Sequence, residues 1–405
     1  MAQAVVVVVT NSIRNMLSAS NALCVVILLG LVQVVQATVL PEERADAMYH
    51  SYEGGGVKVA GPSILVRKDA TTSTSVYYNY YIDNVSSASL DVMTGGSPYT
   101  EKRTEQTGGI DYLHGKTITS LSYTTSVEND YKSGTLNFNL SQDFFGDLST
   151  LTFGYTLGKD HVSRRGLNYD LSEISRQNYR LGFSQVLSKN FVMGASWETI
   201  TDDATELQDN TGTYSGVTLN NPYRSYSYLD STTGNRGFAP EKYPNTHTSN
   251  AFAINGSYYL SFRAALHGKV KFYQDSWGVT ATTYQVNYTY PLGSWIFDFR
   301  TRWYSQNKAD FYSDMFDYKD QYIFMARDRE LATFQSTGVG VTASWDFAKN
   351  GWGWIDKGSL NMSWDHMEFD YKDFRNNLVT GVTPGTEPLY AYGADIYQLF
   401  VSIWY

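Results

Sequence analysis

The feature that most constrains this chain of 405 residues is a side-chain alternation that repeats from Val76 to the carboxyl terminus. In one such unit the apolar residues Leu136, Phe138 and Leu140 alternate with asparagines. Successive side chains of a β-strand point to opposite faces of a sheet, so each unit predicts a strand with one apolar and one polar face. A unit of about ten residues is also the length of a tilted strand that crosses a bilayer.

The connections between these units fall into two alternating length classes. The pattern predicts about 14 strands, within a range of about 12 to 16, near residues 74–82, 105–113, 117–127, 134–144, 149–159, 176–187, 191–201, 248–260, 264–275, 280–290, 295–306, 333–347, 358–370 and 391–405. Short turns alternate with mostly long loops, as expected when every second connection emerges at the same end of an up-and-down barrel. A soluble antiparallel sheet with one wet face shows the same alternation of side chains but has no reason to sort its loops. The predicted fold is therefore all-β, a single antiparallel up-and-down transmembrane barrel over residues 73–405.

The last stretch of the chain is the most apolar of these units. Counting back in twos from the end gives only apolar or aromatic residues, namely Tyr405, Ile403, Val401, Leu399 and Tyr397. A terminal aromatic residue with this pattern resembles the closing strand of bacterial outer-membrane barrels, where the barrel assembly machinery recognises it. The resemblance implies the outer membrane of a Gram-negative bacterium as the location, with membrane lipid and that machinery as partners.

The amino-terminal segment has the pattern of an export signal. Arg14 precedes an apolar run over residues 22–35, and small residues up to Ala37 fit a cleavage site, so residues 1–37 are predicted to be a signal peptide. A membrane-anchoring helix is the other interpretation, although the run is shorter than the roughly 20 residues that a span needs. Residues 38–72 are predicted to be a periplasmic lead-in or partial plug, with an extra strand as the alternative.

The composition suits a barrel and excludes several other classes. The chain has 33 Tyr, 20 Phe and 9 Trp but a mean hydropathy of only -0.33, which fits aromatic girdles around a polar lumen. A net charge of -9 argues against nucleic acid as a partner. The single cysteine, Cys24, lies in the signal segment, so no disulfide is expected. The sequence has no phosphate loop, cysteine metal site or haem attachment motif, and no cofactor is expected.

Several sequence blocks extend the resemblance beyond architecture. From about Arg44 to Tyr405 the chain resembles a family of bacterial outer-membrane proteins catalogued as a domain of unknown function, and the blocks that carry this likeness are residues 44–50, 97–101, 141–147, 221–225, 259–267 and 309–314. Genes of such proteins often lie near genes for flavin-transferring and thioredoxin-like proteins. The resemblance therefore implies a periplasmic redox or metal-handling partner, and it assigns no residue a role.

Charged residues in the polar phase of neighbouring strands predict a basic patch in the lumen. If the apolar phase faces lipid, the patch contains His267, Lys269, Lys271, Arg300 and Arg302, because adjacent strands lie about 4.8 Å apart. Acidic lumen residues are predicted at Asp143, Glu198, Asp298, Asp346 and Asp365. The patch is either an anion-attracting constriction or a salt-bridged filling that stiffens a narrow barrel.

Two loops carry further candidate residues. Asp310, Asp314, Asp317 and Asp320 lie close together in one loop and could hold a hard cation, although their spacing matches no calcium loop and a plain solvated loop has the same composition. The long loop from Asp202 to His247 is predicted to be a lid or a lumen constriction.

Enzyme motifs are sparse in this sequence. The histidines in predicted outer loops, His161 and His247, have Asp160 and Asp202 as conceivable partners, but no spacing links them to a nucleophile. We therefore expect no enzyme. The favoured function is a pore or transport role for a small hydrophilic or ionic solute. The alternatives are a non-conducting scaffold that docks the periplasmic partner and, third, a hydrolase at the rim.

Overall fold

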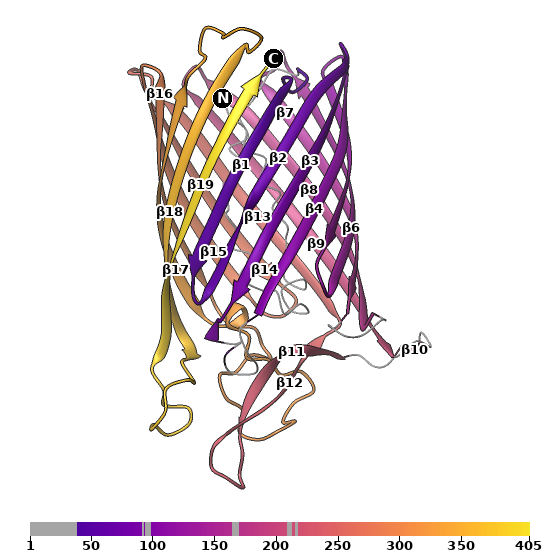
Figure 1. Ribbon diagram of the computed structural model, residues 1–405, viewed down its shortest axis with the longest axis vertical. Helices are drawn as coiled ribbons and strands as arrows, with labels where there is room; N and C mark the ends of the chain where they lie inside the picture. The colour runs from indigo at the N-terminus through magenta and orange to yellow at the C-terminus, as the bar shows by residue number, and fades with distance from the viewer. Residues whose placement is uncertain (1–38, 91–92, 94–98, 164–169, 209–212, 215–217) are drawn as a thin grey trace.

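The alternating units form strands that pair antiparallel with their neighbours and close on themselves (Figure 1). The computed structural model describes residues 39–90, 93, 99–163, 170–208, 213–214 and 218–405. Over these residues 16 strands close the barrel. The predicted all-β barrel is confirmed, and the favoured count of about 14 strands is wrong because two more strands precede the alternation. The predicted signal peptide lies outside the described residues.

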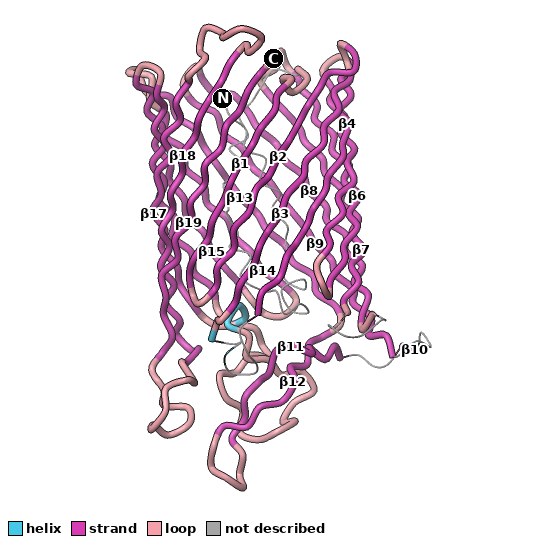
Figure 2. Tube along the Cα trace, viewed as in Figure 1, coloured by secondary structure: helices cyan, strands magenta, loops and turns pink. Residues whose placement is uncertain are grey.

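The strands of the first half of the barrel follow the chain order, and β9 is then joined by a long connection to β13. They are β1 (Arg44–Gly54), β2 (Val57–Thr71), β3 (Thr74–Ser87), β4 (Tyr99–His114), β5 (Thr117–Val127), β6 (Tyr131–Phe144), β7 (Ser149–Val162), β8 (Ser172–Ser188) and β9 (Phe191–Gln208). The second half consists of β13 (Thr246–Tyr259), β14 (Ala265–Asp275), β15 (Thr280–Leu292), β16 (Trp295–Gln306), β17 (Phe334–Asp346), β18 (Lys357–Arg375) and β19 (Leu389–Trp404). Figure 2 shows that loops, a few further strands and one short helix make up the rest of the described chain.

The two strands that the alternation did not predict are β1 and β2, within the segment 38–72 that was predicted to be a lead-in or plug. β1 pairs with β19 from Arg44 opposite Trp404 to Gly54 opposite Ala394, and this pairing closes the barrel. β2 keeps one register against β3 from Val57 to Asp69, with the ladder interrupted only at Gly61 and Pro62, and the register shifts between Asp69 and Thr71. Proline donates no hydrogen bond, and the inward positions Val57 and Leu65 are apolar, so no polar phase marks this strand in the sequence.

The two ends of the barrel differ in their connections. Both ends of the described chain lie at one end, here called the terminal end (Figure 1). The turns at that end are residues 72–73, 115–116, 145–148, 189–190, 260–264, 293–294 and 347–356. The connections at the opposite end, the loop end, are residues 55–56, 88–98, 128–130, 163–171, 209–245, 276–279, 307–333 and 376–388. The longest connections all lie at the loop end, as the sorting of loops predicted.

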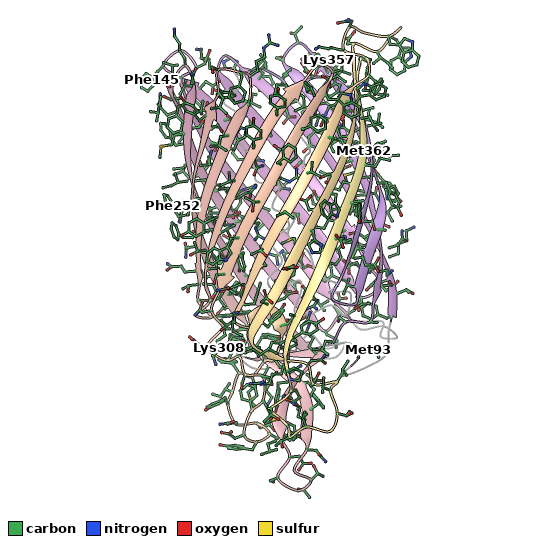
Figure 3. All side chains as sticks on the ribbon, turned by 90° about the vertical axis from the view of Figure 1, so that its left-hand side faces the viewer. Met93, Phe145, Phe252, Lys308, Lys357 and Met362 are labelled. Carbon is green, nitrogen blue, oxygen red and sulfur yellow. The ribbon has the colours of Figure 1, made fainter. Side chains whose placement is uncertain are left out.

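The wall has an apolar outer face and a mostly polar inner face. Leu136 is 42% exposed on the outside, whereas Asp143, seven positions along the same strand and in the other phase, is buried inside. Phe252 and Met362 project from the outer wall (Figure 3). Among the described residues, no helix has both the length and the hydropathy that a membrane-crossing helix needs.

The connections at the loop end fold together into a structure that we call the cap. It consists of the loop 307–333, which contains the short 3-10 helix η2 (Arg329–Leu331), the hairpin of β11 (Thr218–Leu229) and β12 (Arg236–Pro244), and the loop 376–388. The two-residue strand β10 (Thr213–Tyr214) pairs with β9 beside it. Backbone hydrogen bonds join the hairpin to the loop 307–333 in both directions between Lys242 and Met325, each at 2.9 Å.

Beneath the cap, buried apolar side chains fill the mouth of the barrel. We call this cluster the apolar plug, and it joins strands on both sides of the mouth to the loop 307–333: Leu90, Tyr131, Val162, Ile174, Ala204, Tyr243, Trp277, Val279, Ala309, Tyr312, Ala326, Leu331, Ala332, Tyr371 and Phe374. The inward side chains of Ile174 and Ala204 are 0% exposed. Water therefore does not reach these positions, and the described parts of the cap cover them.

Candidate functional site in the barrel lumen

The five residues of the predicted basic patch all lie in the inward phase of their strands. On β14 the neighbours of His267 and Lys271 in the other phase, Leu266 and Phe272, are exposed on the outer wall. The strand register places Lys269 opposite Gln285, and Gln285 opposite Arg302. The three basic residues of the patch on β14 therefore face the two on β16 across a single strand, β15.

Arg300 is neutralised by carboxylates on both sides. Its Nη2 lies 2.8 Å from Asp365 Oδ2, and its Nη1 lies 3.2 Å from Asp298 Oδ1. Hydroxyl groups of Thr342 and Ser363 accept further hydrogen bonds from the same guanidinium at 2.6 and 2.9 Å. The charge of Arg300 is fully paired, as expected if the basic patch is a salt-bridged filling of the lumen.

A glycine makes the pair of Arg300 and Asp365 possible. The two residues lie on β16 and β18, and Gly340 lies between them on β17. A Cβ atom at Gly340 would lie 1.9 Å from Asp365 Oδ1 and 3.1 Å from Arg300 Nη2. Without a side chain there, the long arginine reaches across the middle strand.

Lys269, Lys271 and Arg302 differ from Arg300, and we call these three residues the cation cluster. Within the part of the chain that the structure describes, none of them makes an ion pair. The guanidinium of Arg302 lies 5.2 Å from the ring centroid of Tyr304, and its buried Nε atom has no hydrogen-bond partner. Among the described lumen arginines, Arg176 is paired with Asp202 at 2.6 Å, whereas Arg180 contacts only the side chains of Asn139 and Thr156.

Small residues on the neighbouring strands leave space around the cation cluster. Ala253 lies opposite Lys271 on β13, and Gly338 lies opposite Arg302 on β17. Ser196, inward on β9, is exposed to the lumen. Toward the loop end, Tyr273 and Tyr304 follow the cluster on β14 and β16, and Tyr273 packs against the apolar plug. The cluster therefore borders the underside of the plug.

The predicted acidic lumen residues all lie in the inward phase, but within the described residues only two of them form an ion pair with the patch, namely Asp298 and Asp365 with Arg300. Glu198 accepts a hydrogen bond from Asn178 at 2.9 Å, and Asp143 accepts one from Thr150 at 2.6 Å. Asp346 lies near the terminal end of β17. Among the described residues, therefore, none of these acids forms an ion pair with the cation cluster, and Glu198 interacts with Lys269 only at longer range.

The four aspartates predicted to form a cation loop do not converge on one point, so that hypothesis is wrong. Asp314 binds Arg236 at 2.7 Å and Arg327 at 3.1 Å. Asp320 binds Lys242 at 2.6 Å. Asp317 pairs with Gln321, and Asp310 lies beside Gly278. These side chains hold the cap together instead, because basic residues of the β11–β12 hairpin and of the loop itself take the place of a metal ion.

Within the described residues, one group of carboxylates is close enough to hold a metal ion. Oxygen atoms of Glu101, Glu128 and Asp130 lie within 4.8 Å of one another at the loop end. All three side chains also interact with other protein groups, so protein contacts alone account for the cluster.

The cap is held by an ion-pair network that the sequence did not indicate. Arg236 on β12 forms two hydrogen bonds of 2.8 Å to the carboxylate of Glu387 and one of 2.7 Å to Asp314. Arg327 donates to the backbone carbonyl of Arg375 at 2.7 Å. The network, which we call the latch, joins all three segments of the cap. Its partners are up to 151 positions apart, so no local spacing reveals them.

Glu241 is a buried carboxylate at the junction of the hairpin and the loop 307–333. It accepts a hydrogen bond of 2.7 Å from the backbone N–H of Arg327 and another from the hydroxyl of Tyr243. Burial, reinforced by the charge of Asp328, raises the pKa of Glu241 to about 7. Its protonation state therefore changes near neutral pH.

The two histidines considered for a rim hydrolase lie on opposite faces of the wall. His161 is outward and lies 3.3 Å from Asp170. His247 is 1% exposed and lies between Asp202 at 3.6 Å and Asp275 at 3.1 Å. In this conformation no substrate reaches the ring of His247.

The residues of the predicted carboxyl-terminal signal follow one face of β19. Tyr397, Leu399, Val401 and Ile403 are in the outward phase, and the Tyr405 hydroxyl donates to the backbone carbonyl of Arg67 at 3.1 Å. Recognition by an assembly machinery stays a prediction.

Comparison with known proteins finds one family and several distantly similar solved structures. The sequence profile of a family described as "Protein of unknown function (DUF3570)" matches residues 58–354. No curated protein matches the chain. Solved structures that resemble it include a bacterial polysaccharide outer membrane secretin, with 8% identity and a TM-score of 0.47 over 90% of this chain and 99% of that chain. A Pseudomonas aeruginosa FadL homologue has 7% identity and a TM-score of 0.40, covering 89% of this chain and 90% of that one. The siderophore receptor PirA from Pseudomonas aeruginosa has 12% identity and a TM-score of 0.40, covering 89% and 63%. Likeness at this level concerns the barrel fold alone.

Proposed function

Since the chain belongs to the DUF3570 family of proteins of unknown function, we propose from the barrel itself that it is an outer-membrane transport protein for a small anionic solute. Outer-membrane barrels have short turns on the periplasmic side and longer loops outside, so we place the terminal end in the periplasm and the loop end at the exterior. The apolar outer wall supports the membrane location. Fractionation of membranes with the chain tracked by antibody tests it, and recovery in the inner-membrane fraction would refute it.

The observation that carries the proposed solute class is the cation cluster. Lys269, Lys271 and Arg302 face the lumen and, in the described residues, have no carboxylate bound to them. Cations in a narrow lumen with low-dielectric walls raise the local concentration of anions and repel cations. If the patch only stiffened the wall, each of these residues would be paired as Arg300 is.

We infer from the buried apolar plug that the described conformation is the closed one. Passage therefore requires the cap to move, and the latch is the contact that holds it. The function that follows is gated transport, in which the solute binds at the cation cluster and the cap controls its access to the exterior. The redox or metal-handling partner remains a separate prediction.

Ion selectivity in planar bilayers tests the proposal directly. Recordings in a salt gradient use the wild-type barrel and the variant Arg236→Met, which loosens the latch, so that a closed cap does not hide a pore. We expect anion selectivity, and we expect the variant with Lys269→Glu, Lys271→Glu and Arg302→Glu to prefer cations. Lys132→Glu, on the outer wall, is the matched control and should leave selectivity unchanged.

Two results would contradict the proposal. If the correctly folded triple variant has unchanged ion selectivity, the cation cluster does not set the selectivity of the barrel. A folded barrel that stays silent even with Arg236→Met would reject transport and favour the non-conducting scaffold.

A further inference from the structure

The outer wall contains a hollow near the loop end, separate from the lumen. It has a volume of about 930 Å³ and lies across β9 and β13–β16. Four outward aromatic side chains border it, namely Trp197, Phe252, Phe272 and Trp303. Because these side chains belong to the outward phase, the hollow opens toward the surroundings of the barrel and not toward the lumen.

The hollow exists because large and small side chains meet in one row. The strand register places Trp197 opposite Phe252 and Phe252 opposite Phe272. The same row continues to Thr282 and then to Ser305. The change from aromatic rings to small hydroxyl side chains leaves a gap on the outer surface beside Phe272 and Trp303.

The lining of the hollow changes from apolar to polar toward the loop end. Asn250, Gln274 and Thr280 line its polar part, and no charged residue lines it. Among the described residues, the side chains of Gln274, Thr282 and Ser305 make no hydrogen bond. Polar groups that face a membrane need a polar partner, because lipid tails offer none.

A single cation stands at the polar end of the hollow. Lys308 follows Asn307, which lines the hollow. It is exposed and makes no ion pair within the described part of the chain. In Figure 3, Phe252 and Lys308 lie on the same side of the barrel, with Lys308 nearer the loop end. Aromatic, neutral polar and cationic groups therefore follow one another along the barrel axis.

We propose that this hollow binds a phosphorylated glycolipid of the outer leaflet. The acyl chains lie against the four aromatic residues, the sugar hydroxyls bond to Gln274 and its hydroxyl-bearing neighbours, and a phosphate binds Lys308. A phospholipid supplies the acyl chains and the phosphate but lacks the sugar hydroxyls that match the amide. The inference rests on the membrane location given under the proposed function and does not depend on transport.

Lipid retention measured by native mass spectrometry tests the site. The wild-type barrel is placed in nanodiscs that contain either lipid A, an acylated and phosphorylated disaccharide, or phosphatidylglycerol, and is then ejected with its bound lipid. We expect retention of lipid A in preference to phosphatidylglycerol. Lys308→Glu and Gln274→Leu should each weaken retention roughly tenfold, because each removes a hydrogen bond, one of them to a charged group. Ser305→Trp, which places a large ring in the hollow, should weaken retention further.

Matched variants on the far wall keep the test specific. Lys132→Glu on β6 and Gln177→Leu on β8 are outward, exposed changes of the same chemistry outside the hollow. Both should retain lipid A as the wild type does, and heat-modifiable migration on gels confirms that every variant is folded. Equal retention of lipid A in Ser305→Trp and wild type, or equal retention of both lipids, would overturn the inference. A barrel that binds lipid A but never conducts would refute only the transport proposal.

Discussion

Removing the charge of Arg236 should release the cap while leaving the barrel intact. This side chain is 7% exposed and binds both Glu387 and Asp314. The variant Arg236→Met keeps a chain of similar length but leaves two carboxylates without their shared cation. Breaking a buried ion pair by removing one partner costs about 3–5 kcal/mol.

The pKa of Glu387 gives a second figure for the same interaction. Burial raises this pKa, but the hydrogen bonds and charge of Arg236, together with backbone hydrogen bonds, outweigh burial and lower the pKa from 4.5 to about 2. A shift of that size corresponds to about 3 kcal/mol by linkage, and solvent screening in the loop region reduces it to about 2 kcal/mol. A loss of about 3 kcal/mol shifts the closed-to-open equilibrium of the cap by roughly a hundredfold.

Hydrogen exchange measures this equilibrium segment by segment. In Arg236→Met we expect amides of the loop 307–333 to exchange roughly a hundredfold faster, with the barrel strands unchanged. Lys242→Met is the control in the same hairpin. Its pair with Asp320 is partly exposed, and such surface pairs contribute about 0–1 kcal/mol. If both variants exchange alike in this loop, the latch does not hold the cap.

The remaining predictions concern pH and the lumen wall. The pKa of Glu241 is raised to about 7, so its contribution to cap stability is present while it is protonated and is lost as pH rises through about 7. Glu241→Gln should therefore keep the cap closed at higher pH, measured by hydrogen exchange, and an unchanged pH profile would refute this. The pKa of Glu387 is lowered from 4.5 to about 2, so its contribution is present above about 4.5 and is lost as pH falls toward 2. Because the contribution of Glu241 declines as pH rises from 4.5 to about 7, the protection of the cap amides, corrected for intrinsic exchange, should be greatest near pH 4.5. Gly340→Val should lower the free energy of unfolding in urea by about 3 kcal/mol because it separates Asp365 from its arginine, whereas Gly268→Val, where a new Cβ meets nothing within 4 Å, should have much less effect.

The barrel and the phase of each strand could be predicted because they depend on local pattern. A period of two assigns a side chain to the inner or outer face without knowledge of the partner strand. That reasoning placed Lys269, Lys271 and Arg302 in the lumen, where the structure has them. The blocks that resembled an uncharacterised outer-membrane family also predicted the family match correctly. The alternation did not predict β2, because its inward residues Val57 and Leu65 are as apolar as its outward residue Ile64.

Which lumen cations are paired could not be predicted in the same way. Arg300 and Arg302 lie two residues apart on one face of β16, and their local sequence gives no reason to separate them. The difference depends on β17 and β18, where Gly340 lets Asp365 reach Arg300 but Met367 lies beyond Gly338 in the row of Arg302. Pairing in a barrel wall thus depends on strand register, which sequence pattern alone does not fix.

The cap connects the unpaired cations to the proposed gating. Lys271 and Arg302 lie one inward position below Tyr273 and Tyr304, and Tyr273 packs against the apolar plug. An anion held at the cluster therefore lies directly beneath the side chains that close the mouth. If it binds the open state more tightly than the closed one, it shifts the equilibrium toward opening by that difference alone. In the triple glutamate variant, added anion should no longer change hydrogen exchange in the loop 307–333. If the variant responds to anion as the wild type does, anion binding at the cation cluster does not control opening of the cap.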